Sequence, residues 1–135
     1  MANSQNRRQM MVALREHVIP VLRTKGFRGS FPHFRRVSAE RIDLLMFQFD
    51  KWGCGFVVEV AACPAVGFTT SWGAHITPLK LTIGYLSSKK RLRLGSAGIG
   101  HDHWFRYDDG QSVDEVARRV LPYLEEQAEP WWANG

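Results

Sequence analysis

The spacing of apolar residues changes twice along this 135-residue chain, and this change restricts the fold more than any other feature. Over residues 4–25 and 113–128, apolar side chains recur at steps of three and four, which is typical of amphipathic helices. Between these segments apolar and polar residues alternate, as they do on half-buried strands. Because helices commonly cover one face of an antiparallel sheet, we predict a single α+β domain over residues 1–135, with an antiparallel sheet of about five or six strands and the N- and C-terminal helices packed on one face.

Residues that end, start or interrupt helices refine both helical predictions. Gly26 follows the first helix and can adopt the left-handed conformation that commonly ends one, whereas Pro20 predicts a kink or a break because it lacks an N–H group. Ser112 and Glu115 form a capping box at the start of the second helix. Pro122 interrupts that helix as Pro20 interrupts the first.

The strands are predicted from alternation and from their content of β-branched and aromatic residues. Residues 50–55 (DKWGCG) form a turn, and residues 64–78, rich in glycine, proline and small residues, form a long loop. The first three strands therefore form an antiparallel meander. The predicted strands are residues 31–37, 41–49, 55–63, 79–86, 91–94 and 103–107.

Composition excludes several classes of protein. With 44% hydrophobic and 23% charged residues the chain is globular rather than disordered. It has no apolar run of the length that a signal peptide or a membrane span requires, so we expect a cytoplasmic protein with no membrane partner. Cys54 and Cys63 match neither a redox pair nor a zinc pair, and both are expected to be reduced and buried. No cofactor is predicted.

The net charge of +5 makes nucleic acid a conceivable partner, because basic side chains neutralise phosphates. The basic residues are nevertheless spread over residues 7–8, 35–36 and 89–93, while acidic residues gather from Asp102 to Glu129. Only a folded surface can show whether the basic segments join. Nucleic-acid binding is therefore an alternative that the sequence does not favour.

Residues 101–107 (HDHWFRY) are the most chemically diverse stretch. On a strand, His101 and His103 would point to one side and Trp104 and Arg106 to the other. Two such histidines could bind a transition metal, but a site usually needs a third protein ligand and none stands at a diagnostic spacing. A histidine beside Asp102 could act as an acid or base, but no nucleophile can be assigned to it. A small enzyme or metal protein centred on the histidines is therefore a third hypothesis, and catalysis is not favoured.

The order of several short motifs resembles a bacterial family described as domain of unknown function 4304. The matching positions are Leu22, Gly26 and Phe27; Phe34 with Arg36; Phe47 with Gln48; Trp52 with Gly53; residues 91–95 (RLRLG); and residues 103–105 (HWF). The resemblance implies a single α+β domain with an antiparallel sheet and no assigned catalytic residues. Some small bacterial domains of this kind are thought to act as immunity or toxin-associated proteins, which implies protein binding. Residues 64–88 depart from the family pattern.

Five residues on predicted strands are candidates for binding: Arg36, Gln48, Arg93, Trp104 and Arg106. If they share the sheet face that the helices leave uncovered, they could line a groove in which an arginine grips a carboxylate or a phosphate. In the other interpretation, Gln48 and Trp104 are ordinary core or edge residues.

The sequence therefore favours a non-enzymatic cytoplasmic binding domain, most plausibly one that binds another protein. Trp131 and Trp132 near the C-terminus either fold back onto the body or form a homodimer contact, because exposed aromatic residues tend to mark interfaces.

Overall fold

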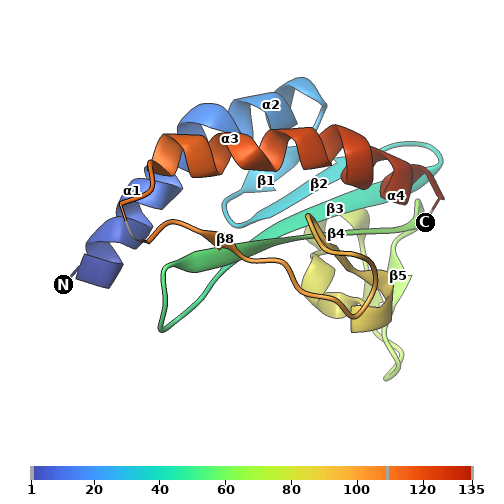
Figure 1. Ribbon diagram of the computed structural model, residues 1–135. Coiled ribbons are helices and arrows are strands. Elements are labelled where there is room, and N and C mark those ends of the chain that lie inside the picture. The colour runs from blue at the N-terminus through green and yellow to red at the C-terminus, as the bar shows by residue number, and fades with distance from the viewer. Residues whose placement is uncertain (1, 109, 135) are drawn as a thin grey trace.

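The structure, a computed structural model, describes residues 2–108 and 110–134 and has a main sheet with the α-helices on one of its faces (Figure 1). Its helices come from the two ends of the chain and lie together above the sheet. They are α1 (Ala2–His17), α2 (Ile19–Thr24), α3 (Val113–Tyr123) and α4 (Glu129–Asn134). The predicted α+β class, with terminal helices on one face of an antiparallel sheet, is confirmed. None of the described helices combines the length and apolar character that a bilayer span requires.

The main sheet has six strands in the order β1-β2-β3-β4-β7, with β8 also paired to β4. Its strands are β1 (Arg28–Ser30), β2 (His33–Val37), β3 (Arg41–Phe49), β4 (Gly55–Pro64), β7 (Leu92–Arg93) and β8 (Phe105–Arg106). The predicted meander is present as β2, β3 and β4, all antiparallel. Strand β1 was not predicted, because a three-residue strand with glycine at its centre carries no alternating pattern.

Strands β7 and β8 are two parts of one interrupted edge strand. Both pair antiparallel with β4, Arg93 opposite Glu59 and Arg106 opposite Gly55. Strand β3 occupies the other side of β4 over the same length, so β7 and β8 follow one another along the same edge. The loop 94–104 leaves the sheet between them.

The predicted break near Pro20 and the predicted start of the second helix are confirmed, whereas Pro122 lies inside α3 and does not interrupt it as predicted. The helix is interrupted between α1 and α2, and Pro20 lies in the first turn of α2. N–H groups in the first turn have no partner within the helix, so the N–H that proline lacks costs no hydrogen bond there. The hydroxyl of Ser112 accepts a hydrogen bond from the Glu115 N–H at 3.3 Å and caps α3. The predicted end at residue 128 is wrong, because a π-helical turn, η4 (Leu124–Ala128), joins α3 to α4. Pro130 lies in the first turn of α4 and does not end it.

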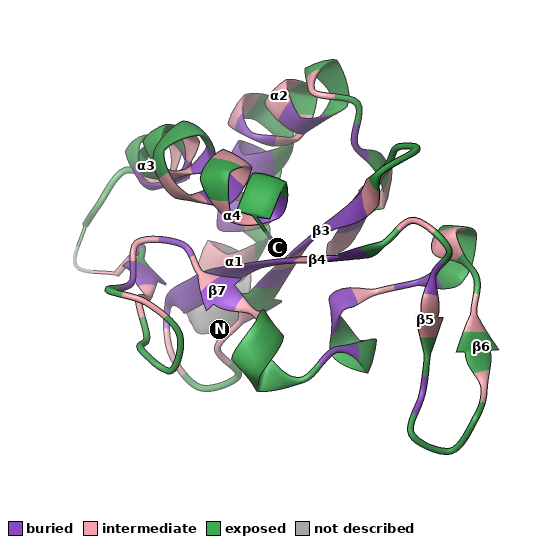
Figure 2. Cartoon of the chain, turned by 90° about the vertical axis from the view of Figure 1, so that its right-hand side faces the viewer, coloured by how far each residue is buried: buried purple, intermediate pink, exposed green. Residues whose placement is uncertain are grey.

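The predicted strand over residues 79–86 is also wrong. The segment forms the short 3₁₀ helices η1 (Pro78–Lys80) and η2 (Ile83–Tyr85), and η3 (Ser88–Lys90) follows. Its alternating residues Leu81 and Ile83 are buried against the sheet without belonging to it. The predicted loop over residues 64–78 contains a small separate hairpin of β5 (Phe68–Thr69) and β6 (His75–Ile76), which protrudes from the body (Figure 2).

The side chains of the sheet enter two apolar cores. The larger core lies between the sheet and the helices, and includes Phe47, Phe56 and Trp132. The smaller core lies on the opposite face, where residues 65–91 cover Ile42 and Leu44 at one end of β3. The second face is thus covered only in part. Neither cysteine forms a disulfide and both are buried, as predicted.

Candidate functional site

Arg36, the first predicted binding residue, lies on the helix side of the sheet. Its guanidinium donates hydrogen bonds to Asp43 at 2.8 Å and to Glu129 at 2.7 Å. It also stacks over the rings of Phe27 and Trp132, at 4.8 and 5.1 Å from their centroids. The prediction that Arg36 lies on the uncovered face is therefore wrong, because its position in β2 directs its side chain toward α4. Arg36 joins the sheet to the C-terminal helix.

Three other predicted residues, Arg93, Trp104 and Arg106, come together at the β7–β8 edge. The guanidinium carbons of Arg93 and Arg106 lie 5.8 and 5.6 Å from the centroid of the Trp104 ring. Phe105 turns into the main core, so Trp104 and Arg106 project from the other face. Gly55 makes room for them, because a Cβ atom there would lie 3.4 Å from the tryptophan ring and 3.2 Å from Nη1 of Arg106.

The two arginines of this cluster differ in their electrostatic environment. Arg93 forms ion pairs with the buried Glu59 at 3.3 Å and with Asp102 at 2.9 Å. Arg91 approaches the same Glu59 carboxylate at 3.4 Å. Arg106 is exposed and makes no hydrogen bond or ion pair with any residue in the described part of the chain. Arg106 is thus the cation of the cluster that is available to a ligand.

Gln48 remains apart from this cluster. It is exposed on β3, in register with Val57 of β4, and its side chain makes no hydrogen bond to another described residue. The sequence thus grouped five residues of which the structure brings three together.

A cleft of about 490 Å³ lies beside the cluster, between β8 and α3. Residues 103–106 line one side, and Arg119, Tyr123 and Glu126 line the other. The cleft therefore combines aromatic surface with charges of both signs. No sequence signal predicts its helical wall, because these three residues fit the polar side of an ordinary amphipathic helix.

The outer edge of β8 faces away from β4 along this cleft. Tyr107 donates its N–H to the carbonyl of Cys54 at 3.0 Å, which makes residues 105 and 107 the ones that bond to β4. Since antiparallel strands alternate in this respect, Trp104 and Arg106 direct their N–H and C=O groups outward. No residue between 2 and 108 or between 110 and 134 bonds to these groups. The cleft therefore contains an unpaired strand edge.

Within the described residues, the two histidines of the sequence motif belong to no group of three metal-ligating side chains. His101 is exposed in the loop 94–104. His103 packs edge-on against Phe105, at 4.9 Å between ring centroids, and against Tyr123 at 6.0 Å. Its ring also covers Gly95, where a Cβ atom would lie 2.4 Å away. His103 is thus held as a wall of the cleft.

A different group of described residues has metal-ligating side chains close together: Glu16, His17 and Asp114. His17 and Asp114 are 97 positions apart in the chain. Sequence reasoning missed this group because no local spacing links the two ends of the chain.

Cys63 is not an activated nucleophile. Burial raises the pKa of its thiol to about 11, and the nearby Asp43 carboxylate adds to the shift. The thiol therefore stays protonated at neutral pH, when only the thiolate is nucleophilic.

Comparison with known proteins agrees with the motif order noted above. Neither the curated proteins nor the solved structures yield a match to the chain. Among protein families, residues 18–134 match the one described as Domain of unknown function (DUF4304). That span includes the whole sheet, α2 to α4 and every residue of the β7–β8 cluster. The chain belongs to the DUF4304 family, as the motif order predicted.

Proposed function

We propose that this protein is a non-enzymatic binding domain that takes an extended segment of another protein along the outer edge of β8. The observation that supports this most strongly is the unpaired edge of Trp104 and Arg106 within the cleft under α3. A peptide that adds a strand to such an edge gains affinity from main-chain hydrogen bonds and specificity from side-chain pockets.

The side chains beside this edge favour an acidic segment. Arg106 is exposed and unpaired among the described residues, and Arg119 lies across the cleft, where it donates to Gln111 at 2.8 Å. Arginine binds carboxylates through two parallel hydrogen bonds. Trp104 supplies a flat apolar surface, and tryptophan and arginine are enriched among the residues that dominate binding energy at interfaces.

We place this function in the cytoplasm, where cysteines that form no disulfide, such as the buried Cys54 and Cys63, stay reduced. Inhibition of a toxin is one form of such protein binding, and a toxin gene beside the gene for this chain would support it.

Selection from a displayed library of random peptides tests the proposal. Selected peptides are expected to carry acidic residues at alternating positions, because successive side chains of a strand point to opposite sides. On binding, the amide of Arg106 should become protected from hydrogen exchange.

Two variants at one position separate main-chain from side-chain recognition. Arg106→Pro removes the outward N–H without removing a bond to β4, and proline is tolerated on edge strands. It should weaken peptide binding at least about tenfold, whereas Arg106→Ala should mainly abolish the preference for acidic residues. Circular dichroism verifies that both variants fold. Peptide binding that Arg106→Pro leaves unchanged would contradict strand addition.

A second candidate function is nucleic-acid binding, and the observation that supports it is a surface hollow of about 510 Å³ with basic side chains at its border. Arg41, Lys89, Lys90 and Trp131 border it, together with the acidic Glu40. In this candidate the cations hold phosphates while Trp131 stacks a base. The affinity for a single-stranded oligonucleotide would then fall steeply with salt and drop further in a Lys89→Ala/Lys90→Ala double variant. A flat titration at low salt excludes it.

A further inference from the structure

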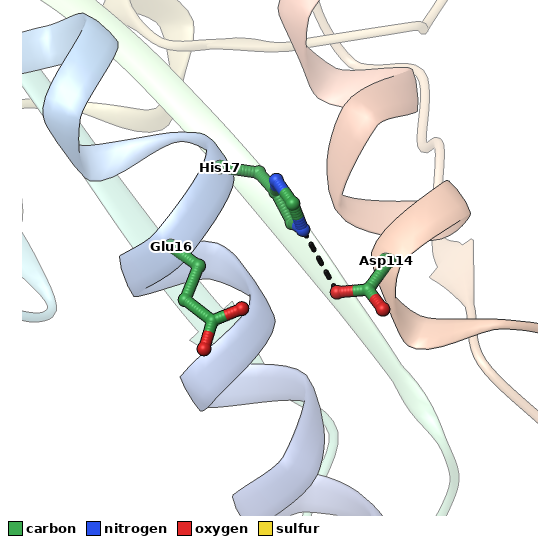
Figure 3. Close-up of side chains that lie close together, drawn as sticks. All are labelled: Glu16, His17 and Asp114. Carbon is green, nitrogen blue, oxygen red and sulfur yellow. Dashed lines mark hydrogen bonds and ion pairs between the residues drawn. The ribbon is translucent and has the colours of Figure 1, made fainter.

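Three metal-ligating side chains meet where the end of α1 approaches the start of α3 (Figure 3). The Nε2 atom of His17 lies 2.8 Å from Oδ1 of Asp114. Glu16 adds a carboxylate, and one ligand atom from each of the three residues lies within 4.8 Å of the other two. Two helices that are distant in sequence thus bring an imidazole and two carboxylates close together.

Rigid elements position these residues. Residues 16 and 17 form the end of α1, and residue 114 lies in the first turn of α3. The neighbouring residues Val18 and Val116 are buried in the main core, which fixes the two helices against each other. The separation between the donors is therefore set by the packing of the domain.

The donor set and its spacing suit one transition-metal ion. Zinc binds imidazole nitrogen and carboxylate oxygen at about 2.0–2.2 Å, so two of its ligand atoms are roughly 3.4 Å apart in a tetrahedral site. The His17–Asp114 separation of 2.8 Å is that of a hydrogen bond. The two atoms would therefore move apart by about 0.6 Å to hold the ion between them. Glu16 is exposed and its carboxylate makes no hydrogen bond or ion pair with the other described residues, so the carboxylate can turn toward the ion.

A neighbouring hollow supplies space for a further ligand. It has a volume of about 360 Å³ and lies between α1 and α3, with Glu16 and Asp114 in its lining. Arg8 and Val12 lie in the same lining. An ion with three protein ligands would thus have its remaining position open to water or a small anion, as in zinc sites with an accessible coordination position.

We infer that Glu16, His17 and Asp114 bind a divalent transition-metal ion, with zinc preferred to magnesium or calcium. Imidazole ligands favour zinc and similar metals, whereas magnesium and calcium select sites made of oxygen alone. Glu16 and His17 precede the region matched to the family and Asp114 lies inside it, so the matched region alone does not contain the whole site. The bound ion joins α1 to α3 and stabilises their contact.

Glu16 distinguishes this site from a simple ion pair. An ion pair between α1 and α3 needs only His17 and Asp114, which are already in contact. Metal binding also needs Glu16. Because Glu16 is exposed and unpaired, Glu16→Gln should leave the metal-free protein as stable as the parent while removing a ligand.

Titration of zinc chloride into protein without a histidine tag, followed by calorimetry and thermal unfolding, tests the inference. One zinc ion per chain should bind and raise the unfolding temperature, and magnesium chloride should not. Loss of an outer-shell partner alone lowers metal affinity by about 10- to 100-fold. Glu16→Gln and His17→Gln should each therefore weaken zinc binding at least about tenfold.

Glu115→Gln is the matched control, because it removes a carboxylate from the same turn of α3 without removing a ligand. It should bind zinc as the parent does, and so should His101→Gln. No saturable binding up to about 100 µM zinc would overturn the inference. Unchanged affinity in Glu16→Gln and His17→Gln, or loss of binding in His101→Gln, would overturn it as well.

Discussion

At the scale of single residues, the buried carboxylate of Asp43 holds two arginines. Its oxygens accept from Nε of Arg36 at 2.8 Å and from Nε of Arg41 at 2.7 Å. Arg36 continues to Glu129 on α4. Trp132 adds a buried hydrogen bond from its indole to the carbonyl of Leu44 at 3.1 Å. The end of the C-terminal helix is thus attached to the sheet by polar contacts as well as by packing.

Asp43→Ala should lower the free energy of unfolding by about 3 kcal/mol, because removing one member of a buried ion pair leaves its partners with uncompensated charge. Urea denaturation measures the change. Asp102→Ala is the control, since Asp102 pairs with Arg93 at an exposed position and should cost less than about 1 kcal/mol. Equal losses in the two variants would show that burial does not matter at Asp43.

At the scale of elements, the π turn η4 lies beside the loop that interrupts the edge strand. Gln127 of this turn accepts a hydrogen bond from the Gly95 N–H at 2.6 Å and donates one to the Ser96 carbonyl at 3.1 Å. These bonds fix the start of the loop 94–104, whose far end leads into the cleft.

Gln127→Ala should loosen this loop. Two hydrogen bonds of about 1 kcal/mol each are lost, so hydrogen exchange should become faster at residues 95 and 96 while β3 stays protected. Glu126→Ala, in the same turn but exposed, is the control. Unchanged exchange at residues 95 and 96 would mean that the loop is held by other contacts.

Elements were predictable from sequence where local chemistry selects them. The Ser112 cap and the helix break at Pro20 depend only on neighbouring residues, and the meander follows from alternation within each strand. The prediction of a strand over residues 79–86 was wrong. The alternating apolar residues Leu81 and Ile83 fit a strand, but they fit an irregular segment that packs on an apolar surface equally well. The helical segment at the C-terminus also continues past its predicted end at residue 128. This continuation depends on the π turn η4, which no sequence pattern indicates.

At the scale of the whole molecule, Glu129 links three parts of the chain. Its carboxylate accepts from Arg36 of β2 and from Lys25 after α2. Burial by itself would raise the pKa of Glu129, but the hydrogen bonds from Arg36 and Lys25 outweigh it and hold the pKa below the ordinary value of 4.5. The charged carboxylate is therefore the form that the folded protein prefers.

This lowered pKa predicts loss of stability in acid. The stabilisation by Glu129 is fully present above pH 4.5, the ordinary value in the unfolded chain, and is lost as the pH falls through the lower pKa of the folded protein. Glu129→Gln should therefore be less stable than the parent at pH 7, and the difference should shrink below pH 4.5. Chemical denaturation across this range measures it, with the exposed Glu126→Gln as control. A difference that stays constant with pH would contradict the prediction.

Local patterns were enough to predict the α+β class, the helices at both ends of the chain, the meander and the family, because each depends on periodicity or on short motifs within one stretch of chain. Local patterns could not predict that Arg36 faces the helices, that β7 and β8 share one edge, or that His17 contacts Asp114. These contacts join segments far apart in sequence. Their partners are chosen by how the sheet and helices pack together, and no local pattern records that choice.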